Sequence, residues 1–390
     1  MKNVKIEDVA LICRGASPRP IIDYITKKDD GVNWIKIGDV DDDSIYINKT
    51  EEKITNEGAL KSRFVKKGDF ILSNSMSFGR PYILNIDGCV HDGWLILSDY
   101  EKFMLQKYFY YVLKSNNTQE QFVKTAQGAT VKNLNSDIVR KTSIKIYDFP
   151  KQQKIVSTLD KINAIIDSDK KQLKLLDEMI KSRFIEMFKD DLKEKTNRLS
   201  DLCEVITKGT TPTTLGFDFV EEGVNFVKIE CITETYEFLI DKMLHITSEC
   251  DEKLKRSKLK ENDVLFSIAG AIGRTAIVSK DILPANTNQA LAIIRLKKDS
   301  GLNVIFLNEM LHTELITEQV DGKKNGVAQT NLSLTDIGNL NVIVPSMEKQ
   351  LKFESFVNLI DKLKFNVQQH LNLMQELLDK KMEEFFGGVE

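Results

Sequence analysis

The chain has 390 residues, with 55 Lys and Arg against 58 Asp and Glu, so its formal net charge at pH 7 is −3. Hydrophobic residues make up 42% of it and charged residues 29%, a composition typical of globular domains, which excludes fibrous and disordered classes. The length predicts two or more domains, and the near-neutral charge does not by itself indicate a nucleic-acid-binding protein.

Targeting and metal-binding signals are weak in this sequence. The N-terminal stretch MKNVKIEDVA lacks the apolar core of a signal peptide, and no apolar run approaches the roughly 20 residues that cross a bilayer, so we expect a cytoplasmic protein that does not bind a membrane. No C-x-x-C pair occurs, so reduced thiols are expected rather than disulfides or a zinc site. The cysteines are Cys13, Cys89, Cys203, Cys231 and Cys250.

Residues 1–150 form a first predicted domain in which three polar loops separate strand-like segments: the first loop (14–19), the second loop (73–80) and the third loop (128–133). Glycine allows close backbone approach, hydroxyl groups donate to phosphate oxygens, and cations neutralise phosphate charge. These loops and one nearby lysine are therefore candidate DNA contacts. The candidates are Arg14, Gly15, Ser17, Arg19, Lys36, Ser73, Asn74, Ser75, Ser77, Arg80, Lys132 and Asn133.

A long helix is predicted over residues 151–195, after Pro150, because proline suits the first turn of a helix. Its apolar residues repeat at the 3.5-residue spacing of a coiled coil. About 37 helical residues span roughly 55 Å, the length of a spacer between two domains. The predicted seam comprises Leu159, Ile162, Ile166, Asp169, Leu173, Leu176 and Ile180.

Residues 196–345 repeat the first domain. The segment from Lys66 to Arg80 aligns without a gap on the segment from Lys260 to Arg274, with five identities at a constant offset of 194. Further matches keep their order at offsets between 192 and 198, which indicates an internal duplication. The corresponding first, second and third loops are residues 208–213, 267–274 and 322–331. Their candidate DNA contacts, with one nearby lysine, are Lys208, Gly209, Thr210, Thr211, Thr213, Lys228, Ser267, Arg274, Lys323, Lys324, Asn325 and Asn331.

A second long helix is predicted over residues 346–390, following Pro345. Its predicted seam comprises Ile360, Leu363, Val367, His370, Met374 and Leu377. Asp169 and His370 interrupt the two seams, and an antiparallel pair of helices would bring them close together. The alternative is that each helix packs only on its own domain. The sequence thus predicts an α+β fold in which two similar α/β domains alternate with two long helices that form an antiparallel coiled coil about an internal pseudo-two-fold axis.

Structural explanations compete with the DNA-binding interpretation of each loop. A single glycine loop is also a simple turn, and lysine clusters are usually solvated. Arg80 and Arg274 can reach phosphate or guanine, or they can pair with the repeated Asp69 and Asp263 and hold a hairpin together. The sequence leaves both explanations open.

Catalytic motifs are missing. The sequence contains no phosphate-binding loop, dinucleotide fingerprint, H-E-x-x-H or G-x-S-x-G, and its four histidines are far apart. Glu51 and Lys53, near the acidic residues 41–43, resemble part of a nuclease site, but they have no counterpart in the second copy. The sequence favours a chain without a catalytic or metal site.

In its order of domains and helices, the chain resembles the specificity subunit of type I restriction-modification systems. The G-x-x-P loops, the G-R elements and a Pro–Gln motif before each helix, read as Pro150/Gln153 and Pro345/Gln350, carry this resemblance over the whole chain. It implies two target recognition domains that read the two halves of a bipartite DNA site, held at a fixed gap by the helices. It also implies that two adenine methyltransferase subunits and restriction subunits join the complex.

Under this resemblance, S-adenosylmethionine, ATP and magnesium belong to the partner subunits, and this chain holds no cofactor. Residues 199–345 carry 15 basic and 21 acidic residues, a net charge of −6, so we expect weak DNA binding by the isolated chain. A rival hypothesis is a duplicated coiled-coil scaffold that never contacts DNA; a third is a nuclease that uses the Glu51 region. The target sequence, the gap length and the methylated adenines cannot be deduced from the sequence.

Overall fold

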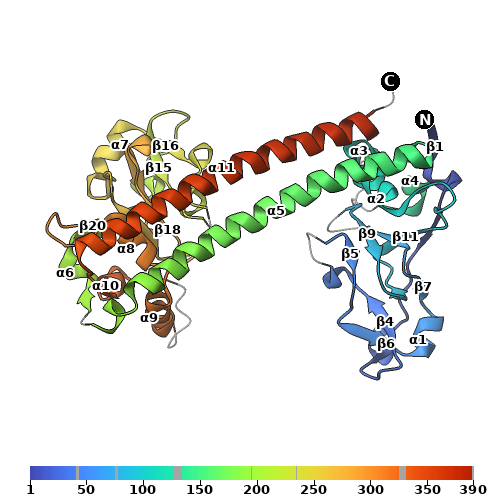
Figure 1. Ribbon diagram of the computed structural model, residues 1–390, viewed down its shortest axis with the longest axis horizontal. Helices are drawn as coiled ribbons and strands as arrows, with labels where there is room; N and C mark the ends of the chain where they lie inside the picture. The colour runs from blue at the N-terminus through green and yellow to red at the C-terminus, as the bar shows by residue number, and fades with distance from the viewer. Residues whose placement is uncertain are drawn as a thin grey trace. The chain divides into compact units, whose positions relative to one another are not determined.

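The computed structural model describes residues 1–40, 44–74, 78–126, 134–194, 196–233, 235–324 and 331–388. The chain divides into two compact units (Figure 1). Unit 1 is Met1–Lys170 with Gln369–Glu390, and unit 2 is Lys171–Gln368. Each unit therefore contains one β-rich domain and one half of each of two long helices.

The strands of unit 1 form sheets of order β1-β12, β3-β6-β4-β10-β7 and β2-β11-β8-β9-β5. The central strands β8, β9 and β11 are almost entirely apolar because both of their faces are buried. The strands are β1 (Lys2–Lys5), β2 (Leu11–Arg14), β3 (Ile25–Thr26), β4 (Val32–Ile35), β5 (Tyr46–Ile47), β6 (Glu52–Ile54), β7 (Arg63–Val65), β8 (Phe70–Ser73), β9 (Pro81–Leu84), β10 (Gly88–Val90), β11 (Trp94–Ser98) and β12 (Ser143–Ile146).

Short helices pack on or beside these sheets. They are α1 (Asn56–Leu60), α2 (Gln106–Lys114), α3 (Asn116–Ala126) and α4 (Ser136–Lys141). Helix α2 buries Tyr108 and Phe109 in the same core as Phe70 of β8. The side chain of Asn135 caps α4 by accepting a hydrogen bond from the Ile138 amide, at 2.9 Å.

Unit 2 contains sheets of order β13-β21, β14-β20-β17-β18 and β16-β15-β19. Its strands are β13 (Asn197–Arg198), β14 (Cys203–Lys208), β15 (Val224–Val227), β16 (Leu244–Ile246), β17 (Val264–Ser267), β18 (Thr275–Ile277), β19 (Ala285–Thr287), β20 (Leu291–Leu296) and β21 (Asn341–Val342). Its short helices are α6 (Leu199–Leu202), α7 (Ser248–Lys253), α8 (Val304–Met310), α9 (Glu314–Lys324) and α10 (Leu334–Gly338).

The two domains share one topology, as the internal repeat predicts. The order β2-β11-β8-β9 in unit 1 corresponds to β14-β20-β17-β18 in unit 2. The register corresponds too, since Trp94 lies opposite Ser73 in one sheet and Leu291 lies opposite Ser267 in the other. In a second sheet of each unit, β4 runs parallel to β10 and β15 runs parallel to β19. The duplication therefore extends to strand order and pairing.

The long helices are α5 (Phe149–Phe188) and α11 (Met347–Phe386). In unit 1, the Asp169 carboxylate lies 2.7 Å from Nδ1 of His370, and Tyr147, just before α5, donates to the Phe385 carbonyl at 3.3 Å. In unit 2, Asp177 pairs with Lys364 at 2.7 Å, while Phe184 packs on Phe353. In both units, residues later in α5 contact residues earlier in α11. The segments of the two helices within each unit are therefore antiparallel. The predicted contact between Asp169 and His370 is confirmed.

The helix starts are anchored by equivalent buried glutamines, Gln152 and Gln350. Gln152 accepts from the Leu105 amide at 2.8 Å and donates to two carbonyls, and Gln350 does the same with the Asn303 amide at 2.8 Å. The sequence prediction matched Gln350 with Gln153, which is exposed. The equivalent residue is Gln152, at an offset of 198. Asp169 therefore corresponds to Val367 rather than to His370.

The predicted seam is correct on α5 and partly wrong on α11. Leu159, Ile162, Ile166, Asp169 and Ile180 are buried, and Leu173 and Leu176 are partly buried. On α11, Ile360 is buried and Val367 and Met374 are partly buried, but Leu363 and Leu377 are 43% and 36% exposed, and His370 is exposed. The inner face of α11 carries Lys364, Leu371 and Leu378 instead, which are partly or fully buried, so that the neighbouring Leu363 and Leu377 are turned outward.

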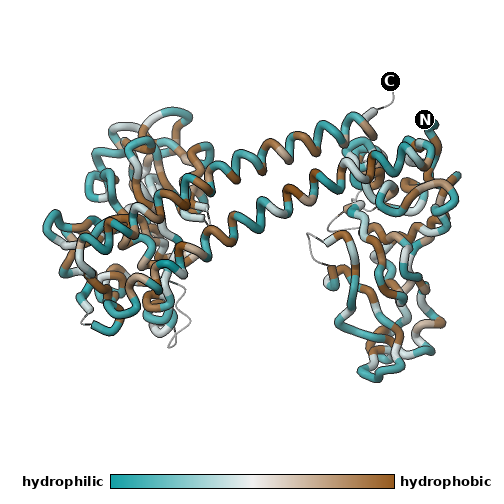
Figure 2. Tube along the Cα trace, in the orientation of Figure 1, coloured by the Kyte–Doolittle hydropathy of each residue, from teal (hydrophilic) through white to brown (hydrophobic). Residues whose placement is uncertain are grey.

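Each helix half also packs on the neighbouring domain. Ile155 and Leu159 of α5 share a core with Tyr108 and Phe109 of α2. Figure 2 shows hydrophobic residues concentrated within each β-rich domain, while hydrophobic and hydrophilic residues alternate along both long helices. The alternative that each helix packs only on its own domain is wrong, because α5 and α11 also contact each other in both units. Among the described helices, none has a stretch long and apolar enough to cross a membrane.

Candidate nucleic-acid interface

The second residue of the first loop in each unit is a glycine that no other residue can replace without movement of the backbone around it. A Cβ on Gly15 would overlap the His91 carbonyl, and a Cβ on Gly209 would overlap the Thr287 carbonyl. The backbone of the loop therefore passes directly over the segment before β11 or before β20. Both glycines are buried, so the close approach that the sequence predicted is to the protein's own backbone.

In unit 1 the first loop is held on a turn of residues 91–93, which we call the central turn of that unit. Ser17 Oγ donates to Asp92 Oδ1 at 2.8 Å, and Arg19 donates to Asp92 Oδ2 at 3.1 Å. Arg14 donates through Nε to the Asp92 carbonyl at 2.9 Å. Three predicted contact residues of the first loop therefore converge on one aspartate.

Asn74 of the second loop joins the same turn, and Leu134, directly after the third loop, is bonded to Asn74. Asn74 accepts a hydrogen bond through its carbonyl from the Leu134 amide at 2.9 Å, directly after the third loop. The Asn74 amide donates to the Gly93 carbonyl and its side chain to the Asp92 carbonyl, both at 3.1 Å. Residues of the first and second loops therefore meet at the central turn, and Leu134, which follows the third loop, is bonded to Asn74 beside it.

Unit 2 builds the same arrangement around residues 288–290, its central turn. Thr211 Oγ1 donates to Gln289 Oε1 at 2.7 Å, as Ser17 does to Asp92. The Ile268 amide of the second loop donates to the Ala290 carbonyl, and the Leu332 amide, next to the third loop, donates to the Ile268 carbonyl, both at 2.9 Å. Asp92 and Gln289 thus occupy equivalent positions on the two central turns, one with a carboxylate and the other with an amide.

Sequence reasoning missed both central turns because they share no identical residue: HDG stands in one copy and NQA in the other. A positional signal was present, since each turn directly precedes the strand that pairs with the repeated FILS or VLFS segment. A comparison that looks for identical residues in the two copies does not detect a position at which the two side chains differ. Such a position is where two copies that read different bases should diverge.

The electrostatics of the first central turn favour a fixed, charged Asp92. The hydrogen bond from Ser17 is the main cause that lowers the pKa of Asp92, so the carboxylate is ionised at neutral pH. Burial lowers the pKa of the neighbouring His91, whose Nδ1 accepts a hydrogen bond from the Gly93 amide at 2.7 Å. Asp92, Arg19 and Lys36 line a surface hollow of about 360 Å³.

Several predicted contact residues have structural roles instead. Ser73 and Ser267 are wrong as DNA contacts because both are fully buried within sheets. Asn74 is 7% exposed and holds the central turn rather than facing solvent. Arg274 donates to the Ile232 carbonyl at 2.8 Å, and the Arg80 guanidinium lies 5.5 Å from the Tyr82 ring.

The proposed pairing of Arg80 and Arg274 with the repeated aspartates is also wrong. Asp263 is fully buried and binds Arg295 through two hydrogen bonds of 2.7 Å. Asp69 accepts from the Lys66 amide at 2.8 Å, and Asp263 accepts from the Lys260 amide at the same distance. Each aspartate therefore stabilises the turn that precedes its strand. In unit 2, Asp263 also neutralises Arg295 of β20.

The remaining predicted residues lie at or near the loops. Lys208 and Thr210 are half-buried, Thr213 and Asn331 are exposed, and Lys36 pairs with Glu52 at 3.1 Å. The Lys228 ammonium lies 4.6 Å from the Phe219 ring. The others lie outside the described residues or have side chains outside them: Ser75, Ser77, Lys132, Asn133, Lys323, Lys324 and Asn325.

The nuclease alternative gains no support from the geometry. Lys53 donates to the Asp29 carbonyl at 3.0 Å, and Glu51 contributes its backbone amide to Asp39. Residues 41–43 lie outside the described residues. Among the residues that the structure describes, no group of three or more histidine, cysteine, aspartate or glutamate side chains is placed to hold a metal ion.

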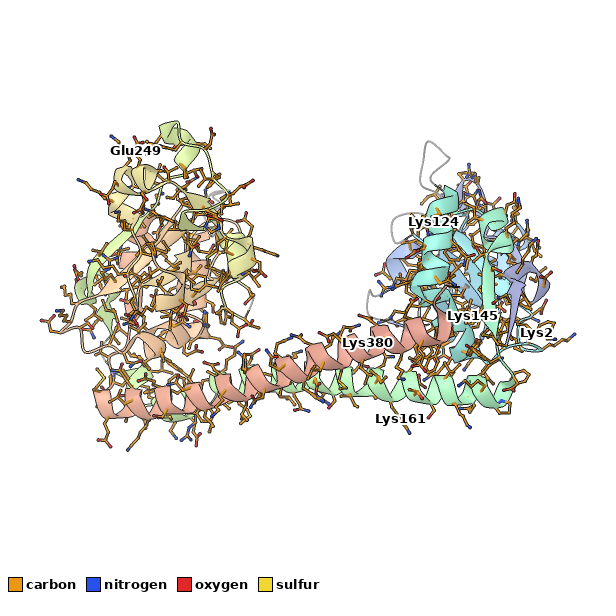
Figure 3. All side chains as sticks on the ribbon, turned by 90° about the horizontal axis from the view of Figure 1, so that it is seen from above. Lys2, Lys124, Lys145, Lys161, Glu249 and Lys380 are labelled. Atoms are coloured by element: carbon orange, nitrogen blue, oxygen red, sulfur yellow. The ribbon has the colours of Figure 1, made fainter. Side chains whose placement is uncertain are left out.

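A larger cavity of about 920 Å³ lies in unit 2 between α5, α8, α9 and α11. Burial raises the pKa of Glu309 on its wall to about 7, and the His312 ring stacks on Tyr236 at 3.7 Å. Six of its eight Asp, Glu and Lys side chains are acidic, so this cavity does not suit a phosphate. Figure 3 shows the side chains that surround the long helices, among them Lys161 and Lys380.

The family model and the related proteins that match this chain carry the same kind of description. The model described as "Type I restriction modification DNA specificity domain" matches residues 1–178 and 193–373. The type I restriction enzyme EcoBI specificity subunit of Escherichia coli is 27% identical over 250 residues, which are 57% of this chain and 52% of that protein. The MjaIX specificity subunit of Methanocaldococcus jannaschii is 24% identical over 410 residues, covering 98% of this chain and 92% of that protein.

Solved structures share the fold. A chain from a structure concerned with complex assembly and conformational transition of the type I R-M system aligns with a TM-score of 0.59 and 16% identity, covering 98% of this chain and 96% of that one. The type I S subunit from M. genitalium aligns with a TM-score of 0.52 and 15% identity, covering 100% and 96%.

Proposed function

Because this chain belongs to the family of type I restriction-modification DNA specificity subunits, we propose that it reads a bipartite DNA site with a fixed gap. Each β-rich domain reads one half of the site, and the antiparallel helices α5 and α11 set the gap between the halves. Residues 1–150 and 196–345 are the recognition domains, and residues 151–195 and 346–390 are the spacers.

One observation carries this proposal: in both units, residues of the first and second loops, and the residue that follows the third loop, are linked to an equivalent central turn with different side chains. Ser17 and Asp92 in unit 1 correspond to Thr211 and Gln289 in unit 2. A duplicated scaffold that varies its exposed polar groups suits a protein that reads two different half-sites in one duplex. A coiled-coil scaffold that never contacts DNA gives no reason for such paired loops.

In this account the chain recognises DNA and does no chemistry itself. Two methyltransferase subunits and the restriction subunits assemble with it in the cytoplasm, and S-adenosylmethionine, ATP and magnesium bind to those partners. The support is the family membership together with the absence of catalytic motifs from the sequence.

The charge of the chain predicts how it binds DNA. Residues 199–345 carry a net charge of −6, from 15 basic and 21 acidic residues, so the partners must supply much of the phosphate neutralisation. We expect the isolated chain to bind duplex DNA weakly, with a shallow dependence of affinity on salt. The complex with methyltransferase is expected to bind tightly and with a steeper dependence.

Fluorescence anisotropy at several salt concentrations, with the chain alone and with the complex, measures both slopes. Tight, sequence-specific binding by the isolated chain would contradict this division of roles. A complex that fails to bind DNA more tightly than its methyltransferase alone would favour the scaffold hypothesis.

A further inference from the structure

The equivalent positions around the two central turns carry different hydrogen-bonding groups, and some of these groups are exposed in each unit. In unit 1 the Arg19 side chain is 81% exposed, and its guanidinium is held by Asp92 at 3.1 Å. In unit 2 the equivalent of Arg19 is Thr213, at an offset of 194, and the exposed residue on the central turn is Gln289. The two units thus expose different hydrogen-bond donors, a guanidinium and a side-chain amide, on an equivalent backbone around the central turn.

Arg19 is suited to a guanine edge. A guanidinium has five N–H donors, and the contact with Asp92 occupies one edge of the group, so further donors remain for a ligand. Asp92 is itself fixed by Ser17 at 2.8 Å, and this contact keeps it ionised. An arginine oriented in this way matches the O6 and N7 acceptors of guanine in the major groove.

Gln289 is suited to an adenine edge. Its Oε1 accepts from Thr211 Oγ1 at 2.7 Å, which orients the amide and leaves Oε1 a second lone pair and Nε2 two donors. A side-chain amide with one acceptor and one donor matches N6 and N7 of adenine. A carboxylate at the same place in unit 1 has no donor to offer, so Asp92 cannot act in this way.

We propose that Arg19 reads a guanine in one half-site and that Gln289 reads an adenine in the other, with Asp92 and Thr211 as their positioning residues. The inference rests on the proposed function, since it names the base contacts of the proposed recognition domains. Arg19 contacts base edges rather than only phosphate because its orientation is fixed by a carboxylate, which a contact that only neutralises charge does not need.

The test compares variants of the complete methyltransferase complex by methylation-aware sequencing and by methylation rates on duplexes that differ at single base pairs. In Arg19→Lys we expect the preference for guanine at one position of one half-site to fall by about 10- to 100-fold, with the other half unchanged. Gln289→Glu is expected to do the same for one adenine in the other half. Arg198→Lys, which makes the same exchange at an exposed arginine of β13 outside the loops, should leave the motif unchanged.

Three results would overturn the inference: a wild-type motif in the folded variants, a change in both halves at once, or a uniform loss of rate without altered base preference. If Arg19→Lys does not assemble, Asp92→Asn keeps the shape and should weaken the same guanine preference. A wild-type complex that methylates no specific sequence would instead contradict the proposed function, so the two failures are distinct.

Discussion

Replacing residues 1–150 with the recognition domain of a related specificity subunit is expected to change one half of the methylated DNA motif and to leave the other half and the gap unchanged. The physical reason lies at the joint between domain and helix. Within the described residues, the Gln152 side chain bonds only to backbone groups, the Leu105 amide and the Phe103 and Tyr147 carbonyls, which any sequence supplies. A foreign domain with the same backbone can therefore be held on α5.

An exchange of the second recognition domain is the matched experiment, because Gln350 holds that domain as Gln152 holds the first. Gln350 bonds to the Asn303 amide and to the Gly301 and Pro345 carbonyls, so an exchange of residues 196–345 should change only the second half-site. Methylation-aware sequencing of cells that carry each hybrid with its methyltransferase measures both outcomes. A hybrid that alters both halves, or the gap, would show that the units do not read DNA independently.

Asp263→Ala is expected to be among the most destabilising single substitutions in unit 2. The carboxylate is fully buried and accepts two hydrogen bonds of 2.7 Å from Arg295, whose side chain is only 17% exposed. Removing one partner of a buried ion pair leaves an uncompensated charge, at a cost of about 3–5 kcal/mol. Urea denaturation of the complete chain, followed by circular dichroism, measures the change in free energy of unfolding.

The internal repeat supplies the control. Asp69 occupies the equivalent turn and accepts from the Lys66 amide at 2.8 Å, but no arginine pairs with it in the described residues. Asp69→Ala should therefore cost only about 1 kcal/mol, the value of one hydrogen bond. Equal losses from the two alanine variants would mean that the turn, and not the pair with Arg295, accounts for the effect.

The features that could be predicted from the sequence are those that occur in both copies or that follow the regular spacing of apolar residues along a helix. Identities such as Asp69 with Asp263 established the duplication, and the heptad pattern of α5 identified its buried face, including Asp169. The contact of Asp169 with His370 was also correct, although the assumed equivalence of the two residues was not. Antiparallel packing alone brings them together, whatever their places in the repeat.

The errors arose where local sequence does not determine the three-dimensional environment. On α11, apolar residues occupy both the inner face and an exposed face, so Leu363 and Leu377 matched the pattern but lie outside the core. Ser73 and Ser267 looked like loop hydroxyls but close a fully buried strand. Asp92 and Gln289 were missed because their importance comes from contacts with a loop about 75 residues earlier in the chain.

The central claim is that one chain reads two half-sites. The most direct measurement is methylation-aware sequencing of a host that lacks methylation of its own and co-expresses this chain with its methyltransferase. We expect adenine methylation at a split motif of two short half-sites with a constant gap. Methylation at a single undivided motif, or no methylation beyond that of the methyltransferase alone, would contradict it.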